Sequence, residues 1–325
     1  MTNAVETQEW TNQTDIREFI LLGFSDLPGL WMLLFVVFLL IYVVTMAGNL
    51  LIVGLIVYDH HLHTPMYFFL GNLSCLETFY SSTILPRMLS SFLTGERTIP
   101  LWGCFIQYYF FGSLVGSECY LLAIMSYDRY LAICRPLHYS VLMNGALCIQ
   151  LMMGSCMSCF LLNSITTYLM SQLTFCGPHI LDHFFCDFTP VIKLACGDTR
   201  QMELMAFILS SLIAFAPFLL TLMSYSSIIT TILRIPSQTG KQKAFSTCSS
   251  HLTVVTVFYG TLVIVYMFPK TNTLKDLNKV FSVFYTVLTP VVNPAVYCLR
   301  NREVKEALCR LTSQLFHFLG RHCFS

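Results

Sequence analysis

Apolar residues are gathered into long stretches that are separated by shorter polar segments. Residues 30–58, 204–233 and 280–299 contain no Asp, Glu, Lys or Arg, while 65–85 and 101–127 contain one carboxylate each. A helix needs about 20 apolar residues to cross roughly 30 Å of hydrocarbon. Each of these stretches is long enough, so the pattern predicts membrane-spanning helices.

Two more stretches follow the same rule. Residues 244–269 contain no Asp, Glu, Lys or Arg, and their one titratable basic side chain is His251. The core of the uncharged segment 136–181 adds another span. We therefore predict an all-α membrane protein, a seven-transmembrane helix bundle over residues 30–299, between an outer segment 1–29 and an inner tail 300–325. The expected spans are about 30–58, 64–86, 101–127, 145–170, 204–233, 244–268 and 279–299.

Composition excludes the other broad classes. The chain is 55% apolar and 11% charged, whereas a soluble domain carries roughly 25% charged residues. Disordered chains are poor in aromatic residues, and this one has 27 Phe. The net charge of +1 gives no reason to expect a nucleic-acid partner.

The distribution of basic residues favours an N-terminus outside the cell and a C-terminus inside. In that orientation ten of the 18 Lys and Arg lie in inner loops and the tail, as the positive-inside bias requires. The first thirty residues lack the features of a cleaved signal peptide, so the first span is expected to insert as an anchor. Asn12 begins an Asn-Gln-Thr sequon on the outer side and is the expected glycosylation site.

Four of the 14 cysteines lie on the outer side, where disulfides form. Cys104 stands at the mouth of the third span, and Cys176, Cys186 and Cys196 stand in the long loop before the fifth. Four cysteines allow three pairings, and spacing does not choose among them. The string at 183–187 reads H-x-x-C-D, which would suit a soft metal, but a cysteine in a disulfide is lost as a thiolate ligand. We expect no metal and no other cofactor.

Two carboxylates fall within spans, where a charge is costly and calls for a role. Glu77 lies in the second span and Glu118 in the third. We predict that Glu77 belongs to a functional polar network, while for Glu118 packing and function are equally open. The chain has no phosphate loop, no H-E-x-x-H string and no nucleophile elbow, so we expect no enzyme activity.

Specific strings then suggest a family. Asp128-Arg129-Tyr130 ends the third span, and Asn293-Pro294-Ala295-Val296-Tyr297 lies in the seventh. Both resemble signatures of rhodopsin-like G-protein-coupled receptors. Four longer blocks resemble those of vertebrate olfactory receptors of the tetrapod type: LHTPMYFFLGNLSCLE (62–77), MSYDRYLAICRPLHY (125–139), KAFSTCSSHLTVV (243–255) and TPVVNPAVYCLRN (289–301). The departures are mild, with Glu77 standing where many members have Asp.

The resemblance implies an activation switch at the inner end of the bundle. Asp128 would hold Arg129 in the resting state, and activation would free the arginine as the sixth span moves outward. Tyr225 and Tyr297 resemble the tyrosines that meet this arginine in active receptors. The expected switch residues are Asp128, Arg129, Tyr130, Tyr225, Asn293, Pro294, Tyr297 and Glu77.

The resemblance also implies partners and disulfides. The cystine pairs would be Cys104–Cys186 and Cys176–Cys196. The partners would be a small odorant, a stimulatory-type G protein that raises cyclic AMP, and membrane lipid beneath a short amphipathic helix at 302–318. Localisation would be the plasma membrane of cilia on olfactory sensory neurons. Nothing in the sequence indicates an oligomeric state.

Helical spacing selects one face of the outer third span for a ligand pocket. The expected lining residues are Tyr108, Phe111, Gly112, Val115, Gly116 and Cys119, facing Ser210 and Ala214 of the fifth span and Tyr259, Leu262, Val263 and Tyr266 of the sixth. This wall is mostly apolar, and we expect its two glycines to leave volume, which suits a small volatile molecule. The alternative is that these residues only pack helices. Two other functions stay open: a receptor for a metabolite outside the nose, and a cation transporter or channel using Glu77 and Glu118.

Overall fold

The structure is a computed structural model that describes residues 17–24, 29–176, 178–267 and 275–322. Within its helices, the side chains at 243, 247, 265–267, 275–278, 300 and 314–322 are not described. Two predicted sites therefore fall outside the description, namely the whole of Asn12 and the side chain of Tyr266.

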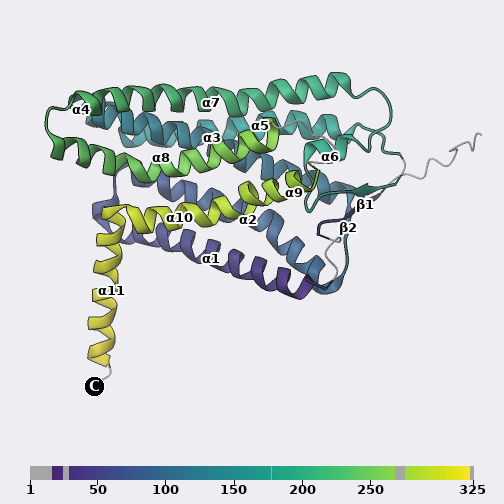
Figure 1. The fold of residues 1–325 in the computed structure, drawn as a ribbon, viewed down its shortest axis with the longest axis horizontal. Helices are drawn as coiled ribbons and strands as arrows, with labels where there is room; N and C mark the ends of the chain where they lie inside the picture. Colours follow the sequence, from purple (N-terminus) through teal and green to yellow (C-terminus); the bar gives the residue numbers. More distant parts are fainter. Residues whose placement is uncertain (1–16, 25–28, 177, 268–274, 323–325) are drawn as a thin grey trace, which may run out of the picture.

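Long helices packed side by side form the body of the molecule (Figure 1). In chain order they are α1 (Trp31–Tyr58), α2 (Pro65–Thr94), α3 (Leu101–Cys134), α5 (Gly145–Ser171), α7 (Arg200–Arg234), α8 (Gln238–Met267), α9 (Lys275–Val283) and α10 (Thr289–Arg300). A π-helical turn, η3 (Phe284–Leu288), joins α9 to α10. Shorter pieces are η1 (His60–Leu62), α4 (Pro136–Leu142) and α6 (Phe188–Ile192), and α11 (Arg302–His322) forms the tail.

Within the described residues, five helical stretches are long and apolar enough to cross a membrane, and α8 makes a sixth if its two parts, which meet at 46°, are one span. The α2 helix is 30 residues long but more polar, and it carries a large share of the buried core. The predicted all-α membrane bundle is confirmed. Several helices run past the expected spans, since α2, α7 and α8 begin or end with polar turns that continue the helix.

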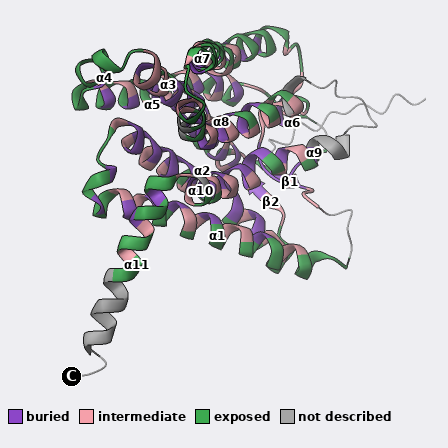
Figure 2. Ribbon diagram, turned by 60° about the vertical axis from the view of Figure 1, so that its left-hand side comes forward, coloured by how far each residue is buried: buried purple, intermediate pink, exposed green. Residues whose placement is uncertain are grey.

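The surface of the bundle shows which helices meet lipid. Large apolar side chains are exposed along α1, α5 and α7 (Figure 2), including Met32 at 69% and Leu161 at 64%. A water-soluble fold would bury such residues, whereas hydrocarbon solvates them as well as a protein core does. The lipid-facing surface therefore lies mainly on these three helices.

A small three-stranded sheet covers the outer end of the bundle, and no sequence pattern predicts it. Strand β1 (Glu18–Leu21) pairs antiparallel with β2 (Thr98–Pro100) and parallel with β3 (Ile180–Leu181). This pairing joins the N-terminal segment to the loop after α2 and to the long loop before α7.

The tail helix α11 turns away from the bundle axis at its inner end (Figure 1). Two guanidinium N–H groups of Arg310 donate to Oδ2 of Asp59, at 2.8 and 2.6 Å. His61 also contacts Asp59, through its ring and its backbone N–H. The Arg310 hydrogen bonds hold the pKa of Asp59 at about 2, below its ordinary 3.8, so the loop after α1 anchors the tail as an ion pair.

Candidate functional site

The inner end of α3 holds an arginine beside a buried carboxylate. Asp128 is fully buried, and its Oδ2 lies 3.9 Å from Nε of Arg129. Its other oxygen accepts a hydrogen bond from the Tyr139 hydroxyl of α4 at 2.9 Å. Burial, reinforced by the charge of Asp128, raises the pKa of Tyr139, so this phenol remains a hydrogen-bond donor. Asp128 therefore connects Arg129 to the loop that follows α3.

A second contact joins the inner halves of α7 and α8. The Tyr225 hydroxyl lies 2.6 Å from Nδ1 of His251, and both side chains are buried. Tyr297 of α10 is 1% exposed, and its hydroxyl has no hydrogen-bond partner among the described residues. Arg129 is near enough to act electrostatically on both tyrosines. Of the predicted switch residues, the structure thus places Asp128, Tyr225 and Tyr297 near Arg129, and it adds His251, which the sequence analysis did not select.

The middle of the bundle contains a buried polar network. The side-chain amide of Asn293 donates to Oε1 of Glu77. Asn49 of α1 donates to the carbonyls of Pro290 and Thr45, each at 3.2 Å. These contacts tie α1, α2 and α10 together at mid-membrane depth, where a polar group without a partner is expensive. Asn49 is a member that the sequence analysis missed.

Glu118 of α3 lies in the same region. It is fully buried and interacts electrostatically with Glu77. Glu118 interacts with the Tyr80 hydroxyl of α2, but neither of its oxygens has a hydrogen-bond partner of good geometry among the residues described. Its placement inside the bundle, away from lipid, follows the cost of exposing a carboxyl to hydrocarbon.

The predicted lining residues of α3 contact several different elements. Phe111 packs its ring against Tyr80, Phe185 and Tyr285, while Tyr108 faces Phe188 of the outer loop. The wall therefore meets α2, the long outer loop and the α9–α10 side, as well as the fifth and sixth spans.

The two glycines of this wall act in helix packing. A Cβ added at Gly112 would lie 2.9 Å from Oδ1 of Asn163 in α5, and one at Gly116 would lie 2.9 Å from Cγ2 of Ile213 in α7. The interpretation that these glycines leave open volume is wrong, because other helices fill the space beside them.

The predicted lining residues of the fifth and sixth spans do not share one environment. Ser210 is exposed, and its hydroxyl donates to the Ala206 carbonyl of its own helix, so that hydroxyl is already satisfied within α7. Val263 is exposed at 45%, whereas Leu262 packs against the core. Tyr259 is buried and donates to the Cys119 carbonyl at 3.1 Å, which joins α8 directly to α3. Val115 and Ala214 are half-buried.

The long outer loop is fixed to the bundle by a disulfide between Cys104 and Cys186, whose Cα atoms are 5.4 Å apart. Gln107 reinforces it, accepting from the Cys186 backbone N–H and donating to the Thr83 carbonyl. A second disulfide joins Cys176 to Cys196. Both pairs are those that the resemblance implied. In the described parts of the chain, no three His, Cys, Asp or Glu side chains are grouped to hold a metal ion.

A bundle of membrane-spanning helices with a disulfide-fixed outer loop, a buried polar network and an Asp-Arg pair at its inner end is typical of G-protein-coupled receptors. The family model described as "Olfactory receptor" matches residues 38–315. The chain belongs to the olfactory receptor family, and it is accordingly an odorant-sensing receptor and not an enzyme.

Curated relatives agree over nearly the whole length. The chain is 48% identical to human (Homo sapiens) Olfactory receptor 6B1 over 93% of this chain and 97% of that protein. It is 50% identical to human Olfactory receptor 10A7, over 93% and 96%. It is 49% identical to Olfactory receptor 6Z7 of Mus musculus, over 92% and 96%.

Proposed function

We propose that this receptor binds small, mostly apolar volatile molecules in the outer half of the bundle and activates a stimulatory-type G protein, which raises cyclic AMP. The observation that carries the proposal is the set of contacts around Arg129. Asp128 contacts the arginine, while the Tyr225 hydroxyl is hydrogen-bonded to His251. Outward movement of α8 would break the second contact and release Tyr225 toward the arginine.

The ligand class follows from the polarity of the wall. Apart from the buried Tyr259, whose hydroxyl is bonded to a backbone carbonyl, the rest of the proposed lining is mainly aromatic and aliphatic. A pocket of that kind favours apolar ligands with few polar atoms. No Asp or Lys stands among the proposed lining residues, so an amine held by a salt bridge is not expected.

The remaining proposals concern surroundings and modification. The receptor would reside in the plasma membrane of olfactory cilia, with α11 resting on anionic lipid through its basic residues. Asn12 would carry the glycan. Enzymatic removal of N-glycans should increase the gel mobility of the wild type and leave Asn12→Gln unchanged, and an unshifted wild type would contradict the outside position of the N-terminus.

The function is tested by screening an odorant panel against a cyclic AMP reporter in cells that express the receptor. An agonist should raise cyclic AMP in the wild type, and Arg129→Ala should abolish the response while surface staining remains. Arg135→Ala is the matched control, because this exposed arginine follows α3 without contacting Asp128. Responses that survive Arg129→Ala, or ion flux without cyclic AMP, would reject the proposal.

A further inference from the structure

The outer end of the seventh span is attached to the long outer loop at two successive positions. Nζ of Lys279 lies 2.5 Å from Oδ1 of Asp182, and Nε2 of His183 lies 3.3 Å from Oγ of Ser282. Lys279 and Ser282 are three residues apart in α9, so their side chains lie on one face of that helix. Two neighbouring loop residues therefore contact one face of α9, and we call these four residues the clasp.

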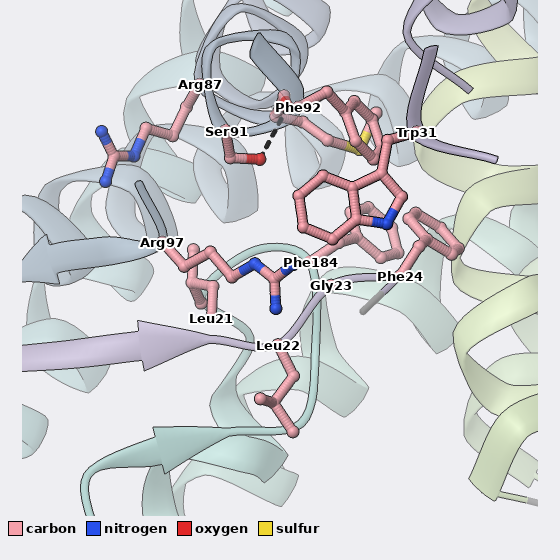
Figure 3. Close-up of a pocket in the computed structure, with 11 residues that line it drawn as sticks. Leu21, Leu22, Gly23, Phe24, Trp31, Arg87, Ser91, Phe92, Arg97 and Phe184 are labelled. Carbon is pink, nitrogen blue, oxygen red and sulfur yellow. Dashed lines mark hydrogen bonds between the residues drawn. The ribbon is translucent and has the colours of Figure 1, made fainter. Parts of the chain in front are cut away.

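The lysine of the clasp also reaches the segment after β1. Its Nζ donates to the Gly23 carbonyl at 3.3 Å, and the Gly23 N–H donates to the His183 carbonyl at 3.1 Å. The ring of Phe24 lies 5.7 Å from that of Phe184, and Figure 3 shows both rings beside Gly23. Lys279 is therefore the point at which α9, the outer loop and the N-terminal segment meet.

The attachments of the outer loop differ in strength. A covalent bond between Cys104 and Cys186 holds the loop to α3, and the backbone pairing of β3 with β1 holds it to the N-terminal segment. The clasp that holds it to α9 is made by side chains, and the Asp182 side chain is 53% exposed, so water competes for its carboxylate. The clasp is therefore the attachment that breaks most readily.

A hinge follows the clasp directly along the chain. The α9 helix ends at Val283, and in the π-helical turn η3 the Thr289 N–H donates to the Phe284 carbonyl, five residues earlier. Turns of this kind are places where helices bend, and they are frequent at functional sites. Bending at η3 would move α9 while α10 stays in the bundle.

The clasp adjoins an aromatic cluster that belongs to the proposed odorant pocket. Phe185 is fully buried, and its ring centroid lies 5.1 Å from that of Phe111 and 4.7 Å from that of His183. Tyr285 of η3 packs against the other side of this cluster, 6.0 Å from Phe111. These rings fill the region in the closed arrangement, so space beside Phe111 forms as α9 moves away from the loop.

We propose that α9 is a gate for odorants, hinged at η3 and held closed by the Asp182–Lys279 ion pair, through which small apolar molecules reach Phe111. The His183–Ser282 contact supports the closed position. The inference rests on the proposed function, because Phe111 is a proposed lining residue of the odorant pocket. Its test uses no odorant and no signalling step, so failure of the gate and failure of the receptor function are separate results.

The test measures how fast a small reagent reaches a thiol placed behind the gate. Phe111→Cys is introduced into the full-length receptor in nanodiscs, and 2-hydroxyethyl methanethiosulfonate, an uncharged reagent of odorant size, is added. Peptide mass spectrometry follows this cysteine apart from the native ones. Adding Lys279→Gln should raise the labelling rate by about tenfold, because the charged half of the ion pair is removed. Lys193→Gln is the matched control, an exposed lysine of the same loop outside the clasp, and it should leave the rate unchanged.

A second variant keeps the test decisive if Lys279→Gln fails to fold. Asp182→Asn changes a largely exposed side chain and leaves Lys279 beside the Gly23 carbonyl, and it should raise the labelling rate to a similar extent. Exchanging the charges, with Asp182→Lys and Lys279→Asp together, should return the rate toward that of the closed gate. Unchanged labelling in both single variants, an equal rise in Lys193→Gln, or a charge-exchanged receptor that labels as fast as the single variants would overturn the proposal.

Discussion

Tyr225 and His251 are joined by a buried hydrogen bond in which the phenol oxygen lies 2.6 Å from Nδ1 of the imidazole. The two residues belong to α7 and α8, and Nε2 of His251 has no partner among the described residues. Among the described residues this is therefore the one side-chain hydrogen bond of the imidazole, and it engages the Tyr225 hydroxyl with His251 and not with Arg129.

Breaking this contact from its two ends should have opposite effects. His251→Leu frees the Tyr225 hydroxyl for Arg129, so basal cyclic AMP should rise by about two- to tenfold, the equivalent of a hydrogen bond of roughly 0.5–1.5 kcal/mol. Tyr225→Phe removes the resting contact and the active one together, so basal signalling should not rise and the agonist response should fall. A rise of similar size in both variants, at equal surface expression, would contradict this account.

Tyr259 and Tyr266 lie two turns apart on α8 and are expected to differ in effect. Because the Tyr259 hydroxyl donates to the Cys119 carbonyl, Tyr259→Phe loosens α8 from α3 and should alter maximal response with little change in agonist potency. If the agonist bonds to Tyr266, Tyr266→Phe should weaken potency by about three- to tenfold. Agonists without a polar atom are the internal control, and a potency loss shared by them would remove Tyr266 from the site.

Some parts of this structure can be predicted from the sequence and others cannot. Membrane-spanning helices follow from uncharged runs, which are a local property, and the four outer cysteines stand out by their compartment. The small outer sheet had no such signal, because its strands are two to four residues long and find partners more than 70 residues away.

The lining of the proposed odorant pocket is also only partly predictable from the sequence. Helical spacing groups Phe111, Gly112 and Gly116 on neighbouring faces of α3, but it does not say which helix each face meets. That depends on the rotation and tilt of the whole bundle, so Gly112 meets α5 and Gly116 meets α7. For the same reason His251 was overlooked, since its partner lies in another helix 26 residues away.

Gly116 should be intolerant of even one methyl group. An alanine Cβ there would lie 2.9 Å from Ile213 and 3.2 Å from the Cys159 sulfur, and such overpacking costs about 1–3 kcal/mol. Thermal unfolding of the purified receptor should show a lowered midpoint for Gly116→Ala. Gly154→Ala is the matched control, because nothing lies within 4 Å of its added Cβ. Its midpoint should be unchanged or higher, since alanine favours helix over glycine, and equal losses in the two variants would refute the packing role.

The two disulfides should differ in importance. Cys104–Cys186 is buried and closes a separation of 82 residues, whereas Cys176–Cys196 closes 20 and includes an exposed cysteine. Cys104→Ser and Cys186→Ser should each abolish surface delivery, with a double variant no worse, because loss of a buried disulfide costs about 2–5 kcal/mol. Cys176→Ser should leave part of the receptor at the surface. Additive losses for Cys104 and Cys186, measured by flow cytometry, would argue against their pairing.

The anchor of the tail helix should be insensitive to pH over the physiological range. Asp59 has its pKa lowered on folding from 3.8 to about 2, so its contribution to stability is complete above pH 4 and is lost only as the pH falls through about 2. Arg310→Gln should therefore lower the unfolding midpoint by the same amount at pH 5 and pH 8. The double variant Asp59→Asn with Arg310→Gln should match Asp59→Asn alone, because that change already removes the Arg310 contact as well as altering the contacts with His61. High salt should reduce the effect, since Arg310 is 42% exposed and its charge is screened.

Exposed Arg302, which pairs with Glu306 within α11 itself, supplies the control: Arg302→Gln removes a similar ion pair without detaching the helix from Asp59. A pH-dependent loss between 5 and 8, or an equal loss in Arg302→Gln, would show that the Asp59 contact does not hold the tail.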